Sequence, residues 1–503
     1  MTNNFLVLGP VLFPLVGIIL ALMSARNNQL QRYIGLAAVV AAWLCSLGVL
    51  VQTLDTGLIQ TYHLGGWQPP YGIVLVGDQL SALLTAMAST VVVGGVLYAV
   101  HCKDNSVTYP VFIPAFLGMA TGLHGAFYTG DLFTLFVFLE LMVISSVVLV
   151  AISDNDLGLE AAIKYLLISA MGTLFLLIGI AAVYATFGTL NMADIAFALQ
   201  SGERPLLATA AAVMLAAAFL VKSAVFPFHY WQPDFHTTAP TPVHSVLSSV
   251  VVKVGVYGLI RLTTLLFVEE ADVIQNILIV LGIIGIFFGS LGALRTYDAK
   301  RMLAYSTFGQ IGFILVGIGW GSPLALVGAL VYAVNHAFIK SSLLMLTGVV
   351  SSRNVKKSAK VKEIAGVGKT MPFVGLLYFT GGLALAGVPP LNGFISKLAL
   401  VRGGISVEDW IALGLVVAAG VITMLYMTRT WSLIFQRNPE DDTVALKPKG
   451  YGDSALAPAL LIGLCVLLGL YAEPLIHVAQ TTVEQLSQPV SYINAVLGLD
   501  LSN

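Results

Sequence analysis

The hydrophobic pattern divides the chain into long apolar runs that are separated by short polar stretches. A run of about 20 apolar residues is long enough to cross a bilayer as a helix. Fourteen runs have about this length, near residues 5–24, 33–54, 74–100, 108–129, 131–152, 160–187, 205–236, 240–263, 272–294, 302–320, 322–350, 371–400, 407–434 and 454–475. We therefore predict an all-α integral membrane protein with about 14 transmembrane helices.

The polar segments between these runs are small. The sizeable loops are 351–370 and 436–453, and the mildly amphipathic tail 480–503 is expected to lie at the membrane surface. The N-terminal stretch has no basic segment before the first apolar run, so we expect that run to be a retained helix.

The composition agrees with a membrane protein. Of the 503 residues, 58% are hydrophobic and 10% are charged, whereas a soluble domain has about 25% charged residues. The net charge is −1, so the chain lacks the basic surplus of a nucleic-acid-binding protein.

No pattern in the chain predicts a cofactor, a metal or an enzymatic site. The cysteines are far apart and are interpreted as small apolar helix residues. No metal-ligand cluster, phosphate-binding loop, dinucleotide-binding turn or Ser–His–Asp signature stands out. The histidines form no convincing pair of haem ligands. A transport function therefore fits better than an enzyme.

The basic residues are distributed unequally between alternate loops. When the helices are numbered in chain order, the loops and flanks after odd-numbered helices hold 17 of the 24 basic residues. The even loops hold three, Arg204, Arg261 and Arg402. Positively charged loops face the cytoplasm. We therefore expect both termini on the outer face of the cell membrane.

Four lysines remain, and all of them lie inside apolar runs. They are Lys222, Lys253, Lys340 and Lys397, in predicted helices 7, 8, 11 and 12. A lysine at the centre of a membrane helix costs about 2.5–3.5 kcal/mol on insertion scales. We interpret these lysines as functional groups that face the bundle interior or a water-filled path. Lys397 could instead extend to the membrane surface, since Arg402 is only a few residues away.

Glu140 is the expected partner of these lysines. It lies about ten residues into the fifth predicted helix, in the apolar run "LFVFLELMVI". The alternative is a structural ion pair that only fixes two helices, but such a pair accounts for one lysine and not for four. Because buried cations outnumber buried anions, some lysines must be neutral part of the time, as proton transfer requires.

Two predicted helices are interrupted. Pro227 breaks helix 7 after Lys222, and "GVPPLNG" at 387–393 breaks helix 12 before Lys397. Paired broken helices are typical of inverted-repeat transporters. We therefore predict two inverted five-helix repeats, helices 4–8 and 9–13. The predicted divisions are helices 1–3 at 1–107, the first repeat at 108–265, the second at 266–435, and helix 14 with the tail at 436–503.

Histidines add candidates for proton relay. His244 begins helix 8, nine residues before Lys253, and His336 lies one turn before Lys340 on the same face. Histidine titrates near neutral pH, although a hydrogen-bonded structural histidine is the alternative at each position. Possible accessory residues are His229, His236 and Ser249, of which the two histidines could equally cap the broken helix 7.

Three stretches carry a resemblance to a known family. "GLHGAFYTGDLFTLFVFLELM", "VKSAVFPFHYWQPDFHTTAPTPVHSVLSSVVVKVGVYGLIR" and "GVPPLNGFISK" resemble the antiporter-like subunits shared by respiratory complex I and the Mrp-type multisubunit cation/proton antiporters. The resemblance covers about residues 70–435. It implies that Glu140 and Lys222 form an ion pair between helices 5 and 7. It also implies that Lys253, preceded by His244, is the central lysine of helix 8. Lys340 and Lys397 match the lysines of helices 11 and 12.

The resemblance implies a function within a hetero-oligomer. The leading hypothesis is a subunit that carries protons along the buried Lys, Glu and His residues in exchange for Na+ or another monovalent cation. Its expected partners are another antiporter-like subunit, small membrane subunits and the lipid bilayer. The alternative is a proton-pumping subunit of complex I or of a membrane-bound hydrogenase. An inert scaffold is a third possibility, in which the lysines could be replaced by Leu or Met without loss.

Overall fold

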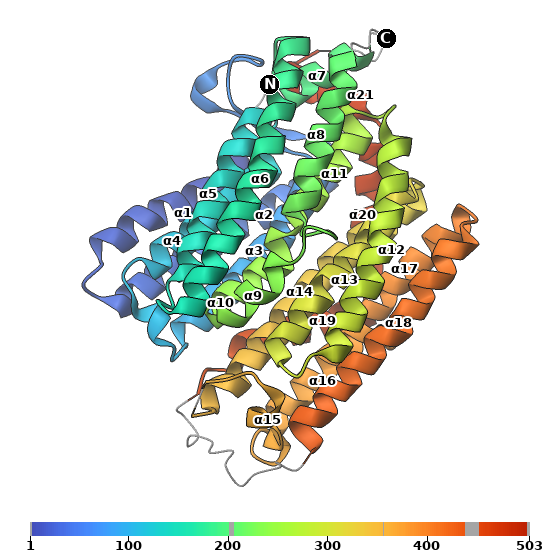
Figure 1. The fold of residues 1–503 in the computed structure, drawn as a ribbon. Coiled ribbons are helices and arrows are strands. Elements are labelled where there is room, and N and C mark those ends of the chain that lie inside the picture. The colour runs from blue at the N-terminus through green and yellow to red at the C-terminus, as the bar shows by residue number, and fades with distance from the viewer. Residues whose placement is uncertain (1–2, 201–205, 356, 438–451, 500–503) are drawn as a thin grey trace.

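The computed structural model describes residues 3–200, 206–355, 357–437 and 452–499. Arg204, most of the loop 436–453 and the last residues of the tail 480–503 lie outside these ranges. The described chain is a membrane protein built from helices, with one small hairpin (Figure 1).

The first three helices are fixed by side-chain caps at their N-termini. Asn4, Asn27 and Asp78 each accept a hydrogen bond from a backbone N–H of the helix that follows, which satisfies donors that a helix start leaves free. These helices are α1 (Phe5–Met23), α2 (Asn28–Thr56) and α3 (Gln79–Val100).

A hairpin that was not predicted from the sequence connects α2 to α3. Strand β1 (Gln60–His63) pairs antiparallel with β2 (Val74–Gly77), and Gln60 lies opposite Gly77. The predicted helix starting at residue 74 was therefore too long at its start. Asp78 caps the helix, and the valine-rich residues before it form the strand, as β-branched residues favour.

The next helices include the first broken one. After α8 the chain leaves the helix and passes Pro227 before α9 begins at Trp231, as the proline predicted. The short helix α7 was not predicted. The elements are α4 (Phe112–Tyr128), α5 (Leu132–Ala151), α6 (Asp156–Phe187), α7 (Met192–Gln200), α8 (Leu206–Lys222), α9 (Trp231–Thr238), α10 (Thr241–Val246), the π-helical turn η3 (Leu247–Val251), α11 (Lys253–Arg261) and the π-helical turn η4 (Leu262–Leu266).

The second half contains the other broken helix. Helix α16 ends at Ala386, and α17 begins at Asn392 after the proline pair of "GVPPLNG". The elements are α12 (Ala271–Arg295), α13 (Ala299–Gly319), α14 (Pro323–Arg353), α15 (Val361–Ile364), η5 (Val367–Lys369), α16 (Pro372–Ala386), α17 (Asn392–Ser406), α18 (Trp410–Trp431), η6 (Ser432–Gln436), α19 (Leu456–Leu470), α20 (Glu473–Leu486) and α21 (Pro489–Leu497). The inverted relation of the two halves stays a prediction.

Each of the predicted apolar runs contains one of these helices or broken helices. Within the described residues, ten helices are long and apolar enough to span a membrane, or eleven if the bent pair α19 and α20 counts as one span. The other predicted spans are α4 and the two broken helices, whose separate pieces are short. Helix α20 turns by 78° from α19.

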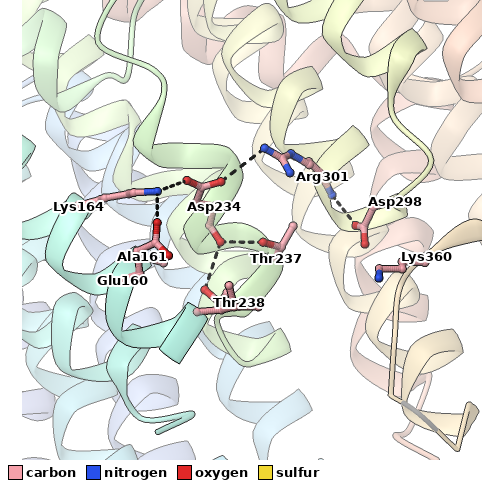
Figure 2. Close-up of a pocket in the computed structure, with 10 residues that line it drawn as sticks. Glu160, Ala161, Lys164, Asp234, Thr237, Thr238, Asp298, Arg301 and Lys360 are labelled. Carbon is pink, nitrogen blue, oxygen red and sulfur yellow. Dashed lines mark hydrogen bonds and ion pairs between the residues drawn. The ribbon is translucent and has the colours of Figure 1, made fainter. Parts of the chain in front are cut away.

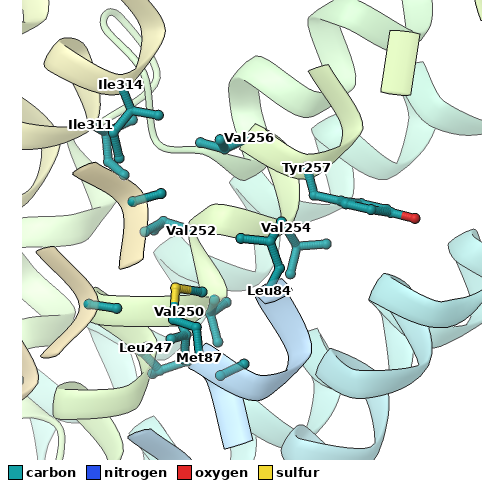
Figure 3. Packing of buried hydrophobic residues seen from close by; sticks show 14 of the residues in the cluster. Leu84, Met87, Leu247, Val250, Val252, Val254, Val256, Tyr257, Ile311 and Ile314 are labelled. Carbon is teal, nitrogen blue, oxygen red and sulfur yellow. The ribbon is translucent and has the colours of Figure 1, made fainter. Parts of the chain in front are cut away.

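Burial separates an inner group of helices from an outer ring. Of the 18 most apolar consecutive residues of each span, 83% are buried in α3, 100% in the continuous span Thr241–Leu266, 94% in α13 and 89% in α14. The corresponding share is 39% in α1, α6, α12 and α18. Figure 3 shows how Val252 and Val254 of the central span pack among Leu84 and Met87 of α3 and Ile311 and Ile314 of α13.

Glycines allow two pairs of helices to approach closely, as is common in membrane bundles. A Cβ at Gly289 of α12 would lie 2.7 Å from the Cα of Gly309 in α13. A Cβ at Gly255 of α11 would collide with the carbonyl oxygen of Phe219 in α8. The second contact holds the helix of Lys222 against the helix of Lys253.

The two terminal regions lie at one end of the molecule. Asn3 forms a bridge with Thr61 of β1, and α21 packs against β1 and α7. Helix α15 lies at the opposite end (Figure 1). The positive-inside prediction assigns the α15 end to the cytoplasm, so we refer to it as the inner end.

Candidate functional site

Glu140 and Lys222 meet between α5, α6 and α8. Lys222 Nζ lies 3.5 Å from Glu140 Oε1. Thr173 of α6 bridges the pair, since its hydroxyl donates to Glu140 Oε1 at 2.5 Å and accepts from Lys222 Nζ at 3.1 Å. Lys222 Nζ also donates to Ser169 Oγ at 2.9 Å. The lysine therefore has partners other than the carboxylate and can change its distance to Glu140 without losing all of its hydrogen bonds.

The exposure of this pair is unequal. The side chain of Lys222 is 5% exposed, whereas that of Glu140 is 27% exposed on the outer surface of the bundle. A small cavity beside Lys222 is lined by Ser169 of α6 and by Val251 of η3. Its volume is about 10 Å³, which is about the space that one water needs. This cavity leads from Lys222 toward the turn that precedes Lys253.

Lys253 is fully buried at the first residue of α11. It follows the π-helical turn η3, a type of distortion that is frequent at functional sites. Its Nζ donates to the Ser249 carbonyl and lies 3.1 Å from His336 Nδ1. Among the described residues it forms no ion pair with a carboxylate. The imidazole is therefore the titratable group in contact with this amine.

Lys340 is equally buried, one turn after His336 on α14. Its Nζ donates to the Leu303 carbonyl at 3.0 Å and to Ser306 Oγ at 2.8 Å, both on α13. Ser306 Oγ lies 2.9 Å from the hydroxyl of Tyr426 on α18. His336 and Lys340 therefore face different neighbours, and α14 connects the contact with Lys253 to a hydroxyl network.

The polar residues that continue this network were not predicted from the sequence. Gln310 Nε2 lies 3.3 Å from the Tyr426 hydroxyl, and Gln310 Oε1 accepts from the Tyr332 hydroxyl at 2.5 Å. Nearby, Asn335 Nδ2 donates to Ser396 Oγ at 2.9 Å. Ser396 precedes Lys397 in the chain. An amide inside an apolar run was the available signal for both Gln310 and Asn335.

Lys397 lies at the second helix break. Its Nζ donates to the Ala386 carbonyl at 2.6 Å, at the end of α16, and lies 5.7 Å from the centre of the Phe313 ring. The side chain is directed to the break rather than to the membrane surface beyond Arg402. A largely apolar groove of about 360 Å³ surrounds it and reaches exposed residues of α18. The break supplies a free carbonyl for the lysine, as expected for irregular backbone at membrane depth.

The four candidate histidines have three kinds of surroundings. His244 Nδ1 lies 3.1 Å from the His236 carbonyl oxygen, and the two rings are 6.2 Å apart. His336 contacts Lys253, as described above. His229 packs among Phe226, Phe288 and Phe308, and no described contact joins it to a lysine. Ser249 contributes its carbonyl to Lys253, while its hydroxyl donates to the Ser245 carbonyl.

A buried ion pair near the outer end was also missed. Arg261 Nη2 lies 2.6 Å from Asp78 Oδ1, and both side chains are almost fully buried. Counting Arg261 among the basic residues of the even loops was therefore wrong, because its side chain is buried in the bundle. Burial alone would raise the pKa of the Asp78 carboxyl, but the charge of Arg261 and hydrogen bonds from Arg261 and Ser81 bring that pKa below its ordinary value. Tyr257 and Tyr492 stack against the guanidinium at 5.1 and 5.2 Å.

An ion network lies at the inner end, where the two predicted repeats meet (Figure 2). Lys164 Nζ lies 2.6 Å from Glu160 Oε1 and 2.9 Å from Asp234 Oδ2. Arg301 Nη2 of α13 approaches Asp234 Oδ1 at 3.5 Å. These residues line an open pocket of about 400 Å³. Asp234 precedes the buried His236 by two residues on α9.

The buried groups are suited to moving protons between fixed positions. Amines, an imidazole and hydroxyls can each donate and, when deprotonated or neutral, accept a proton. Glu140 pairs with Lys222, and within the described residues Lys253, Lys340 and Lys397 form no ion pair, so charging all four lysines at once is unfavourable. Among the described residues, no group of three His, Cys, Asp or Glu side chains could hold a metal ion.

Comparison with known proteins gives a consistent result across the length of the chain. Residues 129–423 match the family model described as "NADH:quinone oxidoreductase/Mrp antiporter, TM". The D-type subunit of the Na(+)/H(+) antiporter of Alkalihalophilus pseudofirmus is 31% identical over 98% of this chain and 99% of its own. The N-type subunit of the NADH-quinone oxidoreductase of Desulforudis audaxviator is 33% identical over 93% of this chain and 96% of its own.

A solved structure has the same fold. A chain in the structure of the Mrp complex from Dietzia sp. DQ12-45-1b aligns with a TM-score of 0.88 and 24% identity. The alignment covers 98% of this chain and 99% of that chain. The helical architecture described above is therefore the fold of a chain found in the Mrp complex.

Proposed function

We propose that this chain, which belongs to the NADH:quinone oxidoreductase/Mrp antiporter membrane family, is the proton-translocating subunit of a multisubunit Na+/H+ antiporter. The observation that carries the proposal is the line of buried amines at Lys222, Lys253 and Lys340, with titratable or hydroxyl groups between them. A Na(+)/H(+) antiporter subunit is among the relatives that the chain matches over nearly its whole length. In this function the chain is a transporter subunit and not an enzyme.

The proton path follows the contacts of the buried lysines. A proton on the Lys222 amine would cross the small cavity beside Val251 and reach Lys253. The Lys253 ammonium would then give a proton to His336 Nδ1, 3.1 Å away, and become a neutral amine. From α14 the proton would pass to Lys340 and then through the hydroxyls of Ser306 and Tyr426 toward the region of Lys397, while Gln310 would only hold the Tyr426 hydroxyl in place.

Glu140 would set the charge of the first lysine. Its pairing with Lys222 favours the ammonium form, and lengthening of the 3.5 Å contact would favour release of the proton. The partial exposure of Glu140 on the bundle surface supports a second role, in which a group on an adjoining subunit competes for the carboxylate. Such competition would couple the lysine charge to movements of the partner.

The cation exchanged for protons would follow a different path. Na+ is a hard ion that prefers oxygen ligands, carboxylates above all, by the same preference that governs Ca²⁺ and Mg²⁺ sites. Glu140 is the clear mid-helix carboxylate among the described spans, and Lys222 and Thr173 already contact it. We therefore assign the cation path to a partner subunit. The complex would lie in the cell membrane with both termini of this chain outside.

The test is antiport in membrane vesicles that contain the complete complex. Glu140→Ala and Lys222→Ala should each abolish Na+-driven proton movement while the complex still assembles. Lys369→Ala, which removes an exposed lysine of η5, is the matched control and should keep normal activity. Full activity in both site variants, with normal assembly, would contradict the proposal.

The second candidate function is a proton-pumping subunit of a redox complex such as complex I or a membrane-bound hydrogenase. The likeness to an NADH-quinone oxidoreductase subunit favours it. The proton path would be the same, but electron transfer in partner subunits would supply the energy. Neighbouring genes distinguish the two functions, since small antiporter subunits would accompany the first and NADH or hydrogenase subunits the second.

A further inference from the structure

A basic pocket lies on the flank of α12 and α13 near the inner end of the molecule. Its volume is about 530 Å³, and it is separate from the line of buried lysines. It is lined by Phe288, Leu291, Gly292, Arg295, Thr296, Arg301 and Tyr305. Two guanidinium groups, a tyrosine and two large apolar side chains therefore share one concave surface.

The positive charge of this pocket is poorly neutralised. Arg295 is exposed, and within the described residues it forms no ion pair. Arg301 has a side chain that is 47% exposed, and its contact with Asp234 is long, 3.5 Å. Asp234 is already bonded to Lys164 at 2.9 Å. Asp298 accepts the backbone N–H of Arg301 as a helix cap, and within the described residues it forms no ion pair with this guanidinium.

A third arginine adds to the positive field. Arg429 of α18 donates to the Leu294 carbonyl at 2.7 Å, directly beside the pocket, and stacks over Tyr297 at 4.6 Å. It forms no ion pair within the described residues. An anion in the pocket would therefore meet the guanidinium groups of Arg295 and Arg301, and the charge of Arg429 beside the pocket would add to their field. Guanidinium forks match phosphate oxygens geometrically.

The other wall of the pocket is apolar and lies where lipid tails would be. Phe288 is 45% exposed and Leu291 is 57% exposed on α12, a helix of the outer ring. The helix ends at Arg295, so apolar and basic residues meet at the membrane boundary. The positive-inside prediction assigns this boundary to the cytoplasmic leaflet, which is rich in anionic lipid.

We propose that this pocket binds an anionic phospholipid of the cytoplasmic leaflet. The phosphodiester would lie between Arg295 and Arg301, and an acyl chain would lie along Phe288 and Leu291. The apolar wall favours a lipid over free phosphate, because free phosphate would gain nothing from it. The open, lipid-facing side of α12 favours a lipid over a buried protein contact.

Occupation of the pocket would alter the inner ion network. Arg301 lines both this pocket and the neighbouring one that contains Asp234. A phosphodiester that binds Arg301 competes with Asp234 for the guanidinium, because one cation then faces two anions. The lipid would therefore leave Asp234 with Lys164 as its cationic partner. This consequence for transport rests on the proposed function, whereas the binding itself does not.

The experiment is lipid binding to the detergent-solubilised complete complex, measured by native mass spectrometry. Phosphatidylglycerol, phosphatidylcholine and inorganic phosphate are titrated separately. The wild type should retain phosphatidylglycerol at least about tenfold more strongly than phosphatidylcholine, and millimolar phosphate should not displace it. Arg295→Gln and Arg301→Gln should each lower phosphatidylglycerol retention by about tenfold, roughly the loss of one charge-assisted phosphate contact.

Arg26→Gln is the matched control, because Arg26 is an exposed arginine of the loop after α1, also at the inner end. It should leave retention unchanged. Equal retention of the two lipids, displacement by inorganic phosphate, or unchanged retention in both pocket variants would overturn the proposal. So would a partner protein found to fill the pocket in the assembled complex. None of these outcomes depends on whether the chain moves protons.

Discussion

Lys253 and His336 are in direct contact across the centre of the bundle, with 3.1 Å between Nζ of the lysine and Nδ1 of the histidine. The two residues lie on α11 and α14, in different predicted repeats, and both are buried. The contact therefore joins the two halves through a pair of titratable groups. Removing either group should interrupt proton movement at this point.

His336→Gln distinguishes proton relay from simple hydrogen bonding. Glutamine can still accept a hydrogen bond from Lys253, but it cannot take up a proton. We expect Na+-driven proton movement to fall by roughly 100-fold, the usual contribution of a positioned acid–base group. The measurement is the quenching of a pH-sensitive dye in vesicles. His477→Gln, at an exposed position on α20, is the control. Normal transport in His336→Gln would mean that the imidazole only holds Lys253 in place.

Tyr426→Phe tests the hydroxyl connection beyond Lys340. The change removes one oxygen, which lies 2.9 Å from Ser306 Oγ and 3.3 Å from Gln310 Nε2, and keeps the ring. We expect transport to slow by at least about tenfold, with little change in assembly, because a single hydrogen bond contributes only about 1 kcal/mol to stability. Tyr471→Phe, at an exposed tyrosine after α19, should have no effect. A Tyr426→Phe complex that transports at the normal rate would remove the Ser306–Tyr426 step from the path.

Gly255→Ala should separate the helices that carry Lys222 and Lys253. The new Cβ would collide with the Phe219 carbonyl oxygen and with Ser223 Oγ, so α8 and α11 must move apart. Overpacking of this kind costs about 1–3 kcal/mol. Thermal unfolding of the purified complex measures the change. Gly463→Ala on α19 is the control, since no heavy atom lies within 4 Å of a Cβ there. Equal unfolding temperatures for the two variants would contradict the close approach of α8 and α11.

Asp78→Asn should destabilise the outer end of the bundle. It leaves the buried guanidinium of Arg261 without its anion, which costs about 3–5 kcal/mol for a buried pair. Asp55→Asn, at an exposed position near the end of α2, should be close to neutral. The double variant Asp78→Asn/Arg261→Met should unfold at a higher temperature than Asp78→Asn, because it removes both charges and keeps a side-chain oxygen for the cap of α3. A double variant that is less stable than the single one would argue against an electrostatic origin.

The same pair predicts a pH dependence with a definite sign. The pKa of Asp78 is held below its ordinary value by Arg261 and Ser81, against the effect of burial. A carboxyl with a lowered pKa contributes stability above its unfolded pKa, about 3.9, and loses it as the pH falls through its folded value. We expect the stability difference between wild type and Asp78→Asn/Arg261→Met to stay constant near neutral pH. It should shift in favour of the double variant only in acid.

The sequence predicted the buried groups better than it predicted their partners. Glu140 and the four lysines could be found because a charge inside an apolar run is costly and conspicuous. Arg261 was misassigned because it lies near the end of its run, where an exposed position is the ordinary expectation. Its partner, Asp78, is 183 residues away, and no local pattern indicates such a contact.

The limits of the fold prediction have similar physical causes. Prolines identified both broken helices, since proline removes a backbone donor wherever it stands. The β hairpin was missed because Val74–Gly77 continues directly into the apolar run of α3, and the cap at Asp78 decides where the helix begins. Gln310 and Tyr426 could not be joined from the sequence, because their contact depends on how α13 and α18 pack.

The most direct measurement is Na+-driven proton movement by the complete complex carrying Lys253→Met. Methionine fills similar space without a titratable group, and Lys253→Arg keeps the charge but cannot release the proton. If protons pass along the buried lysines, both variants should lose transport by roughly 100-fold in complexes that assemble normally. Near-normal transport in Lys253→Met would show that protons cross this subunit by another path, or not at all.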